Sequence, residues 1–213
     1  MAGATGLVGR EILAALLTDK RYAAVHCVGR RTLTVKHPKL FGHVLDFKNL
    51  SAVPGLDHVD DVFIALGSTI KVAGSQAVFR AVDFQAVVAL ARAGKAAGAS
   101  KLGVVSAMGA NADSGVFYNR VKGEMEQALA QLGYQALIIA RPSMLAGNRE
   151  ALAQAPRPSE KLGLALMTLF KPLIPANYRA IAATQVARAL LSAVTSTQRG
   201  TQVLLSGAMQ PVR

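Results

Sequence analysis

The sequence predicts an α/β fold: a doubly wound parallel sheet with helices on both faces and a small C-terminal cap. Short apolar runs alternate with longer segments whose apolar residues recur at helical spacing, as in chains built from successive βαβ units. The apolar residues are mostly alanine, valine and leucine, and tryptophan is absent, a composition that favours layers of helix and sheet over an aromatic-rich sandwich. The 213 residues are expected to form one domain, 1–213, long enough to bury about 70% of its unfolded surface.

Each element follows from its own apolar pattern. Strands are expected from short apolar runs at 23–28, 43–47, 61–66, 102–106, 136–140 and 202–205. Helices are expected where apolar residues recur about every 3.6 residues, along 8–16, 78–90, 117–132 and 186–194. Prolines surround a short apolar helix pattern in 143–180, so this segment is expected to form an irregular cap within the same domain.

Charge and cysteine content restrict the kinds of binding partner and the cellular compartment that the sequence favours. The chain has 24 Lys+Arg against 12 Asp+Glu, a net charge of +12, but the basic residues are scattered, so nucleic-acid binding is not favoured. The apolar run 162–170 is far shorter than the roughly 20 residues that cross a bilayer, and no membrane span is expected. A single cysteine, Cys27, excludes an internal disulfide and favours a reducing compartment, the cytoplasm. The four histidines lack metal-ligand spacing, so no metal is expected.

A glycine-rich turn opens the first helix. Its G-x-x-G-x-x-G spacing differs by one residue from the dinucleotide fingerprint, but it lets backbone N–H groups approach a pyrophosphate in the same way. A glycine turn without a ligand is the alternative. The residues expected to meet the cofactor here are Gly3, Thr5, Gly6, Leu7, Val8 and Gly9.

The end of the next strand indicates which dinucleotide binds. An acidic residue there would bind the ribose 2′-hydroxyl of NAD, but the chain has Arg30 and Arg31, whose guanidinium groups suit the extra phosphate of NADP. Two solvated loop arginines are the alternative. The two following strand ends are expected to meet the adenine and to lie along the cofactor, and they carry Asp46, Phe47, Leu66, Gly67, Ser68 and Thr69.

A serine, a tyrosine and a lysine form the candidate catalytic set. Tyr118 and Lys122 lie one helical turn apart on one face, and Ser106 ends the preceding strand. An ammonium one turn away is expected to lower the pKa of the phenol, so that Tyr118 exchanges a proton with a substrate oxygen held by Ser106. Lys122 is also expected to reach the nicotinamide ribose. A half-buried tyrosine beside a solvated lysine is the alternative.

Taken together, these motifs resemble the short-chain dehydrogenase/reductase superfamily, specifically its atypical branch of Tat-interacting-protein-like oxidoreductases. The resemblance implies a Rossmann-like fold, bound NADP, catalytic Ser106, Tyr118 and Lys122, and Pro142 and Ser143 near the nicotinamide. It is carried by AGATGLVG at 2–9, CVGRR at 27–31, ALGSTIKVAGS at 65–75, VDF at 82–84, VVSAMGA at 104–110, YNRVKGEMEQAL at 118–129 and ARPSMLAG at 140–147.

The sequence therefore predicts an NADP-dependent oxidoreductase that transfers a hydride between NADPH and a carbonyl or alcohol substrate, with Tyr118 as proton donor. The alternative is a non-catalytic NADP-binding regulatory or assembly protein, which would not need the set of Ser106, Tyr118 and Lys122. The small-molecule substrate and the oligomeric state cannot be inferred from the residues.

The strand expected before the glycine turn has no counterpart in the sequence. The strand that feeds the glycine turn is central in a doubly wound sheet, yet only Met1 and Ala2 stand before Gly3. We therefore expect about six to ten further residues upstream in the natural protein, an apolar run of ordinary strand length.

Overall fold

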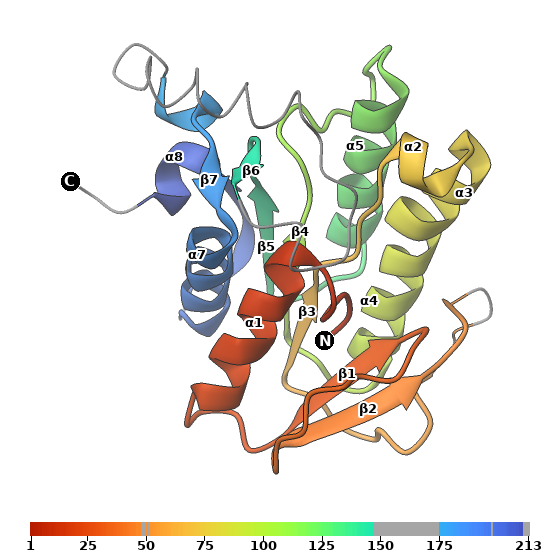
Figure 1. Cartoon of the computed structure of the whole chain (residues 1–213), viewed down its shortest axis with the longest axis vertical. Coiled ribbons are helices and arrows are strands. Elements are labelled where there is room, and N and C mark those ends of the chain that lie inside the picture. Colours follow the sequence, from red (N-terminus) through yellow and green to blue (C-terminus); the bar gives the residue numbers. More distant parts are fainter. Residues whose placement is uncertain (48–49, 51, 147–174, 197, 211–213) are drawn as a thin grey trace.

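The computed structural model describes residues 1–47, 50, 52–146, 175–196 and 198–210, and it confirms an α/β fold with parallel strands flanked by helices (Figure 1). All the strand pairs among these residues are parallel. One ladder pairs β1 with β2, and a second runs in the order β3-β4-β5-β8. The strands are β1 (Val25–Gly29), β2 (Leu40–Val44), β3 (Asp61–Ile64), β4 (Lys101–Val105), β5 (Ala136–Arg141) and β8 (Gly200–Leu205).

Ala2 connects the two ladders. It forms parallel bridges to Val28 of β1 and to Ile64 of β3. Its N–H donates to the Phe63 carbonyl at 2.9 Å, and its own carbonyl accepts from Ala65 N at 2.9 Å. A single residue thus occupies the central position of the sheet, where a doubly wound fold has its first strand.

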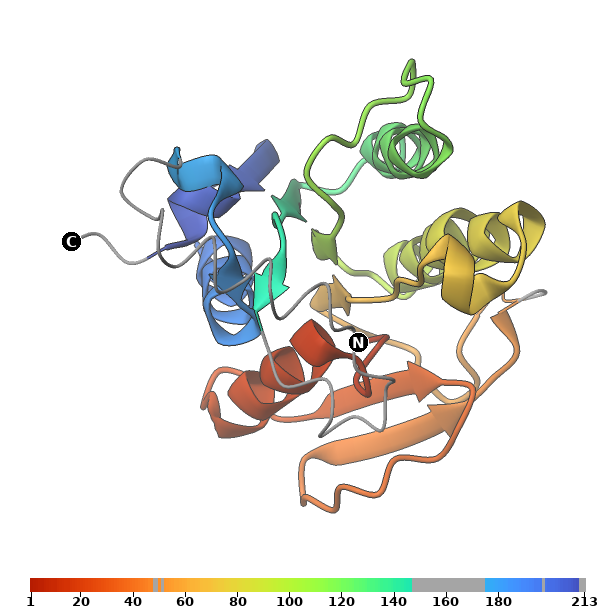
Figure 2. The same ribbon diagram turned by 45° about the horizontal axis from the view of Figure 1, so that its top comes forward.

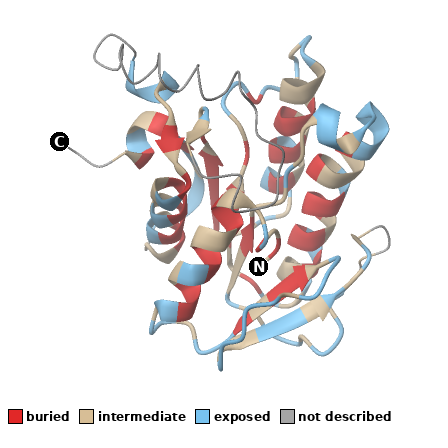
Figure 3. Ribbon diagram, viewed as in Figure 1, coloured by how far each residue is buried: buried red, intermediate tan, exposed pale blue. Residues whose placement is uncertain are grey.

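Two helical layers cover the sheet. Figure 2 shows α1 (Leu7–Thr18) and α7 (Ala183–Thr195) on one side of the strands, and α4 (Val87–Ala96) and α5 (Phe117–Ala130) on the other. Each layer has its own apolar cluster, built around Ile12 and Leu190 on one face and around Leu90 and Met125 on the other. The helix faces that point at the sheet are the buried ones (Figure 3), as the apolar stripes of the sequence predict.

The helix expected over 78–90 is continuous but not uniform. It consists of α3 (Gln76–Arg80), a π-helical turn η2 (Ala81–Ala86) and then α4. π-Turns are rare and occur mostly as single turns inside α-helices, frequently at functional sites. This one carries Asp83, a carboxylate that is 0% exposed.

The other differences from the sequence expectation are local. β2 begins three residues earlier than the expected 43–47, at Leu40. It is an edge strand whose side chains are half-buried or exposed, so its apolar run is a weak signal. Most of the expected cap, 147–174, lies outside the described residues.

Short elements complete the described chain. In and beside the cap, β6 (Leu145–Ala146) pairs with β7 (Ile181–Ala182), near the 3-10 turn η4 (Ala176–Tyr178). Two further short helices are α2 (Ile70–Ala73) and α8 (Ser206–Met209). Within the described part, no helix combines the length and the apolar character needed to cross a membrane.

Candidate cofactor and catalytic site

The glycine turn is compact because two of its glycines leave no room for a side chain. Gly3 has φ +88°, and a Cβ on it would lie 2.4 Å from the Ala65 carbonyl oxygen. A Cβ on Gly9 would lie 1.9 Å from the Gly3 carbonyl oxygen. Helix α1 starts directly after Gly6, which provides no side-chain cap. Helix α1 thus begins at a tight turn, and the uncapped N–H groups of a first helical turn are the kind of site that binds a pyrophosphate.

A cavity of about 120 Å³ joins this turn to the ends of the neighbouring strands. Arg30 and Arg31 line it together with turn residues, so a phosphate bound there would meet both backbone N–H groups and guanidinium groups. This arrangement fits the adenosine end of a dinucleotide. Of the residues expected to bind the cofactor, those that line the cavity are Gly3, Thr5, Arg30, Arg31, Phe47 and Leu66. The turn, strand-end and loop residues from the same prediction that do not line it are Gly6, Leu7, Val8, Gly9, Asp46, Gly67, Ser68 and Thr69.

The loop after β3 links the cavity to the candidate catalytic residues. Leu66 lines the cavity, and a Cβ on Gly67 would lie 3.6 Å from Asp83 Oδ1 and 3.9 Å from Lys122 Nζ. The backbone N–H of Ser68 donates to Asp83 Oδ2 at 2.9 Å. Thr69 has a structural contact, because its Oγ1 accepts from Val72 N and caps α2.

Lys122 and Asp83 form a buried ion pair beside this loop. Lys122 Nζ lies 2.8 Å from Asp83 Oδ1, and the two side chains are 3% and 0% exposed. Tyr118 lies one turn before Lys122 on α5 and packs against Phe79 with ring centroids 5.4 Å apart. Lys122 is therefore not the solvated lysine of the alternative interpretation.

Burial is the main effect on the pKa values of Tyr118 and Asp83. It raises the pKa of Tyr118, a direction that Lys122 opposes and that Asp83 reinforces. The expected lowering of the tyrosine pKa by Lys122 is thus one contribution, but the net direction is the opposite. Burial likewise raises the pKa of Asp83, against the effect of Lys122. The phenol is protonated at neutral pH, the form in which it can donate a proton.

Ser106 contacts a different partner from the one expected. Its hydroxyl donates to Glu126 Oε1, and Arg141 at the end of β5 donates to both oxygens of the same carboxylate. With its hydrogen directed at Glu126, Ser106 does not offer that hydrogen to a substrate oxygen. The structure therefore brings Tyr118 and Lys122 together, while Ser106 belongs to a neighbouring network.

Pro142 and Ser143 connect the end of β5 to its surroundings. The Pro142 carbonyl accepts from Met108 N at 3.0 Å. The N–H of Ser143 donates to Ser206 Oγ at 2.7 Å, and its hydroxyl donates to the Arg179 carbonyl. Ser143 thus links β5, α8 and the described end of the cap.

Two residues that sequence reasoning did not assign have central positions here. Asp83 is a carboxylate within an apolar, alanine-rich helix pattern, which was a visible signal of a buried polar contact. Glu126 continues the four-residue spacing from Tyr118 and Lys122 along α5, so it lies on the same face. Within the described residues, no group of His, Cys, Asp or Glu is placed to hold a metal ion.

Comparisons with known proteins agree with the fold. Residues 3–161 match the protein family described as NAD(P)H-binding. Protein HTATIP2 of Rattus norvegicus is 30% identical over 207 residues, which cover 95% of this chain and 83% of that protein. Protein FMP52 of Coccidioides immitis, whose name includes the word mitochondrial, is 31% identical over 220 residues, 95% of this chain and 87% of the relative.

Two solved structures show the same fold at low sequence identity. MoeE5 in complex with UDP-glucose and NAD has a TM-score of 0.70 at 18% identity, covering 95% of this chain and 73% of its own. A short-chain dehydrogenase/reductase superfamily protein from Agrobacterium tumefaciens with bound NAD has a TM-score of 0.70 at 16% identity, covering 96% and 76%. The fold is thus a Rossmann-like one that binds dinucleotides in those proteins.

Proposed function

Since the chain belongs to the NAD(P)H-binding family, in the branch similar to the Tat-interacting-protein-like short-chain dehydrogenase/reductases, we propose that it is an NADP-dependent oxidoreductase. The reaction is hydride transfer between NADPH and the carbonyl or alcohol group of a small molecule. In this proposal, residues 1–213 form one cofactor-binding domain.

One observation carries this proposal. The loop Leu66–Gly67 connects the cavity that contains the glycine turn and Arg30 to the buried pair of Lys122 and Asp83 beside Tyr118. A dinucleotide that lies along this loop has its adenosine end at Arg30 and its reactive end near Tyr118. Such a path from an anion site to a proton donor is what hydride transfer requires.

The residues have separate roles in this reaction. When bound, NADPH supplies the hydride that adds to the carbonyl carbon. Tyr118 donates its phenolic proton to the carbonyl oxygen, which completes the alcohol. Lys122 stabilises the resulting phenolate and reaches the nicotinamide ribose. Ser106 takes part in holding the substrate oxygen only if its hydroxyl turns away from Glu126, and Pro142 and Ser143 border the nicotinamide end.

The preference for NADP over NAD depends on the adenosine end of the dinucleotide. Arg30, supported by Arg31, pairs with the 2′-phosphate that distinguishes NADP from NAD. The turn residues Leu7 and Val8 present backbone N–H groups to the pyrophosphate, whereas Gly6 N donates to the Gly3 carbonyl at 2.9 Å within the turn. We therefore propose NADP as the cofactor.

The test is consumption of NADPH, followed by its absorbance, with a panel of aldehydes, ketones and quinones. Tyr118→Phe keeps the ring but removes the proton, so turnover should fall by about 10²- to 10⁴-fold while NADPH binding is retained. Tyr134→Phe is the matched control, because it removes a phenol that donates to the Ala91 carbonyl at 2.6 Å, away from the site. Full activity of Tyr118→Phe on an identified substrate would exclude the tyrosine as proton donor.

A non-catalytic NADP-binding regulatory or assembly protein is the second candidate. The hydrogen bond from Ser106 to Glu126 is the observation that favours it, because that hydroxyl is turned away from a substrate. Tight NADPH binding without turnover of any compound in the panel would support this reading.

In either case we place the protein in a reducing compartment, the cytoplasm, since Cys27 is a free, buried thiol. Cell fractionation tests this location against the mitochondrial location in the relatives' names.

A further inference from the structure

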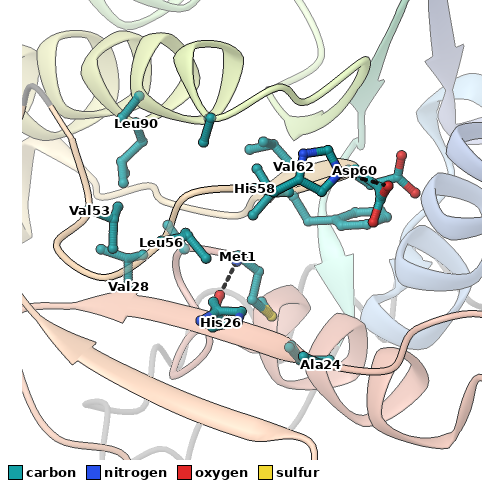
Figure 4. Close-up of a pocket in the computed structure, with 18 of the residues that line it drawn as sticks. Met1, Ala24, His26, Val28, Val53, Leu56, His58, Asp60, Val62 and Leu90 are labelled. Atoms are coloured by element: carbon teal, nitrogen blue, oxygen red, sulfur yellow. Dashed lines mark hydrogen bonds and ion pairs between the residues drawn. The ribbon is translucent and has the colours of Figure 1, made fainter.

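The ion pair of Lys122 and Asp83 is shielded from water. Its two side chains are 3% and 0% exposed. Neither residue lines the cavity of about 430 Å³ beside Met1, shown in Figure 4, or the cavity of about 120 Å³ at the glycine turn. The charge of each side chain is therefore balanced by the other side chain and not by solvent.

Asp83 is held in place by the backbone as well as by Lys122. Its Oδ2 accepts from Ser68 N at 2.9 Å, while its Oδ1 lies 2.8 Å from Lys122 Nζ, so the two oxygens have separate partners. The loop after β3 leaves little room beside the pair, since a Cβ on Gly67 would lie 3.6 Å from Asp83 Oδ1. The carboxylate thus fixes the ammonium group next to the loop along which the proposed dinucleotide lies.

Both charges of this pair act on the phenol of Tyr118. Burial, the largest effect, raises the pKa of Tyr118; Lys122 lowers it, and Asp83 raises it. Further charged groups on the elements packed around Tyr118 have partners of their own: Arg80 pairs with Glu124, Glu126 pairs with Arg141, and Arg120 donates to the Ser114 carbonyl. Lys122 and Asp83 are therefore the two charges whose balance affects the protonation of this phenol.

Given the oxidoreductase function proposed above, we propose that Asp83 is a positioning residue that holds Lys122 and cancels its charge, so that Tyr118 keeps its proton and the protein acts at neutral pH as a carbonyl reductase. In this direction the carbonyl carbon accepts the hydride of NADPH, which is oxidised to NADP, and the carbonyl oxygen accepts the proton of Tyr118. The phenolate that remains takes a proton from water. Alcohol oxidation starts from the phenolate instead, and an ammonium group without a counter-charge would form that phenolate at lower pH.

The first experiment titrates Tyr118 directly, without cofactor or substrate. NMR of the full chain labelled with ¹³C at the tyrosine Cζ atoms follows each phenol, and the signal that Tyr118→Phe removes is that of Tyr118. Asp83→Asn keeps the size of the side chain but leaves the charge of Lys122 uncancelled, so the pKa of Tyr118 should fall by about one unit or more. Glu124→Gln is the matched control, because it removes a carboxylate of α5 that pairs with Arg80, and it should leave this titration unchanged. An equal titration of Tyr118 in Asp83→Asn and in the unmodified protein would overturn the proposal.

A second variant tests the same balance without burying a charge. Asp83→Asn combined with Lys122→Met removes both members of the pair. If the two charges cancel, the pKa of Tyr118 in this double variant should stay within about half a unit of its value in the unmodified protein. A rise of about one unit or more would show that Lys122 lowers the pKa without compensation by Asp83, and it would overturn the proposal even if Asp83→Asn alone does not fold.

The second experiment follows the reaction in both directions, with a carbonyl compound found in the NADPH panel and with the matching alcohol. In Asp83→Asn the ratio of oxidation to reduction at neutral pH should rise about tenfold for each unit by which the pKa of Tyr118 falls. Unchanged pH profiles in both directions would contradict the role of Asp83. Absence of turnover by the unmodified protein would refute the proposed function, and with it the direction of the reaction, whereas the titration alone decides whether Asp83 cancels the charge of Lys122.

Discussion

Replacing Lys122 by methionine would remove the ammonium group that pairs with Asp83, a carboxylate buried from water. The methionine keeps the length of the side chain and its packing between α5 and the loop after β3. Asp83, which is 0% exposed, would then retain only the hydrogen bond from Ser68 N, at 2.9 Å. A buried carboxylate without its counter-charge is the main consequence of the change.

The size of the effect follows from this burial. Removing one partner of a buried ion pair destabilises a protein by about 3–5 kcal/mol, because the remaining charge stays desolvated. At about 2–4 °C per kcal/mol for a chain of this size, the melting temperature should fall by roughly 6–20 °C. Asp83→Asn combined with Lys122→Met should recover about 2 kcal/mol of that loss, since an amide carries no charge.

Urea unfolding followed by circular dichroism measures these differences, with the dependence on urea concentration expected to stay the same. Arg21→Ala is the control: it breaks the pair with Asp19 in which Arg21 is 58% exposed, so its effect on the free energy of unfolding should be much smaller than that of Lys122→Met. A loss below about 1 kcal/mol for Lys122→Met, or a double variant no more stable than Lys122→Met alone, would refute the reasoning from burial.

Four further predictions test the site and the core. Arg30→Ala should remove most of a preference for NADPH over NADH of about 10- to 150-fold, measured by titration of both cofactors; equal affinities in the unmodified protein would contradict the 2′-phosphate contact. Gly9→Ala should destabilise the fold by about 1–3 kcal/mol or more in urea unfolding, whereas Gly115→Ala, with open space around its Cβ, should not; equal stability of the two would contradict the close packing of the turn. Cys27, which is 3% exposed and whose thiol pKa is raised by burial, should react with a thiol reagent only after unfolding, and fast labelling of the native protein would contradict its burial. Because burial raises the pKa of Tyr118, carbonyl reduction should stay constant from about pH 6 to pH 9 and alcohol oxidation should increase with pH; a reduction rate that falls with an apparent pKa near neutrality would contradict this assignment.

The helices and the buried strands were predictable because their apolar residues repeat with the period of the element. The stripe from Val8 to Leu16 gives α1, and the run that contains Ile138 gives β5. β2 was misplaced by three residues because one of its sides faces solvent, so burial does not select its apolar residues. Periodicity reports burial, and it is weak where an element is half-exposed.

The site was predictable in its parts but not in its contacts. Backbone geometry and phosphate chemistry predicted the glycine turn and Arg30 as neighbours, and both line one cavity, while their contact with a cofactor stays a prediction. Asp83 was not assigned: a carboxylate in an apolar helix pattern indicates a buried polar contact, but the residue pattern does not predict the π-turn in which it lies or the partner that it meets. The partner of Ser106 was also missed, since strand-end position does not determine which way a hydroxyl points.

The π-turn at Ala81–Ala86 allows this helix to change length at one place. Such a turn contains about one residue more than an α-helical turn, so it accommodates the extra residue without changing the direction of the helix on either side. Deleting one residue between 81 and 86 would therefore let the helix become regular while α3 and α4 keep their relative orientation. A chain shortened at Asp83 can thus keep Phe79 against Tyr118 and lose only the carboxylate that pairs with Lys122.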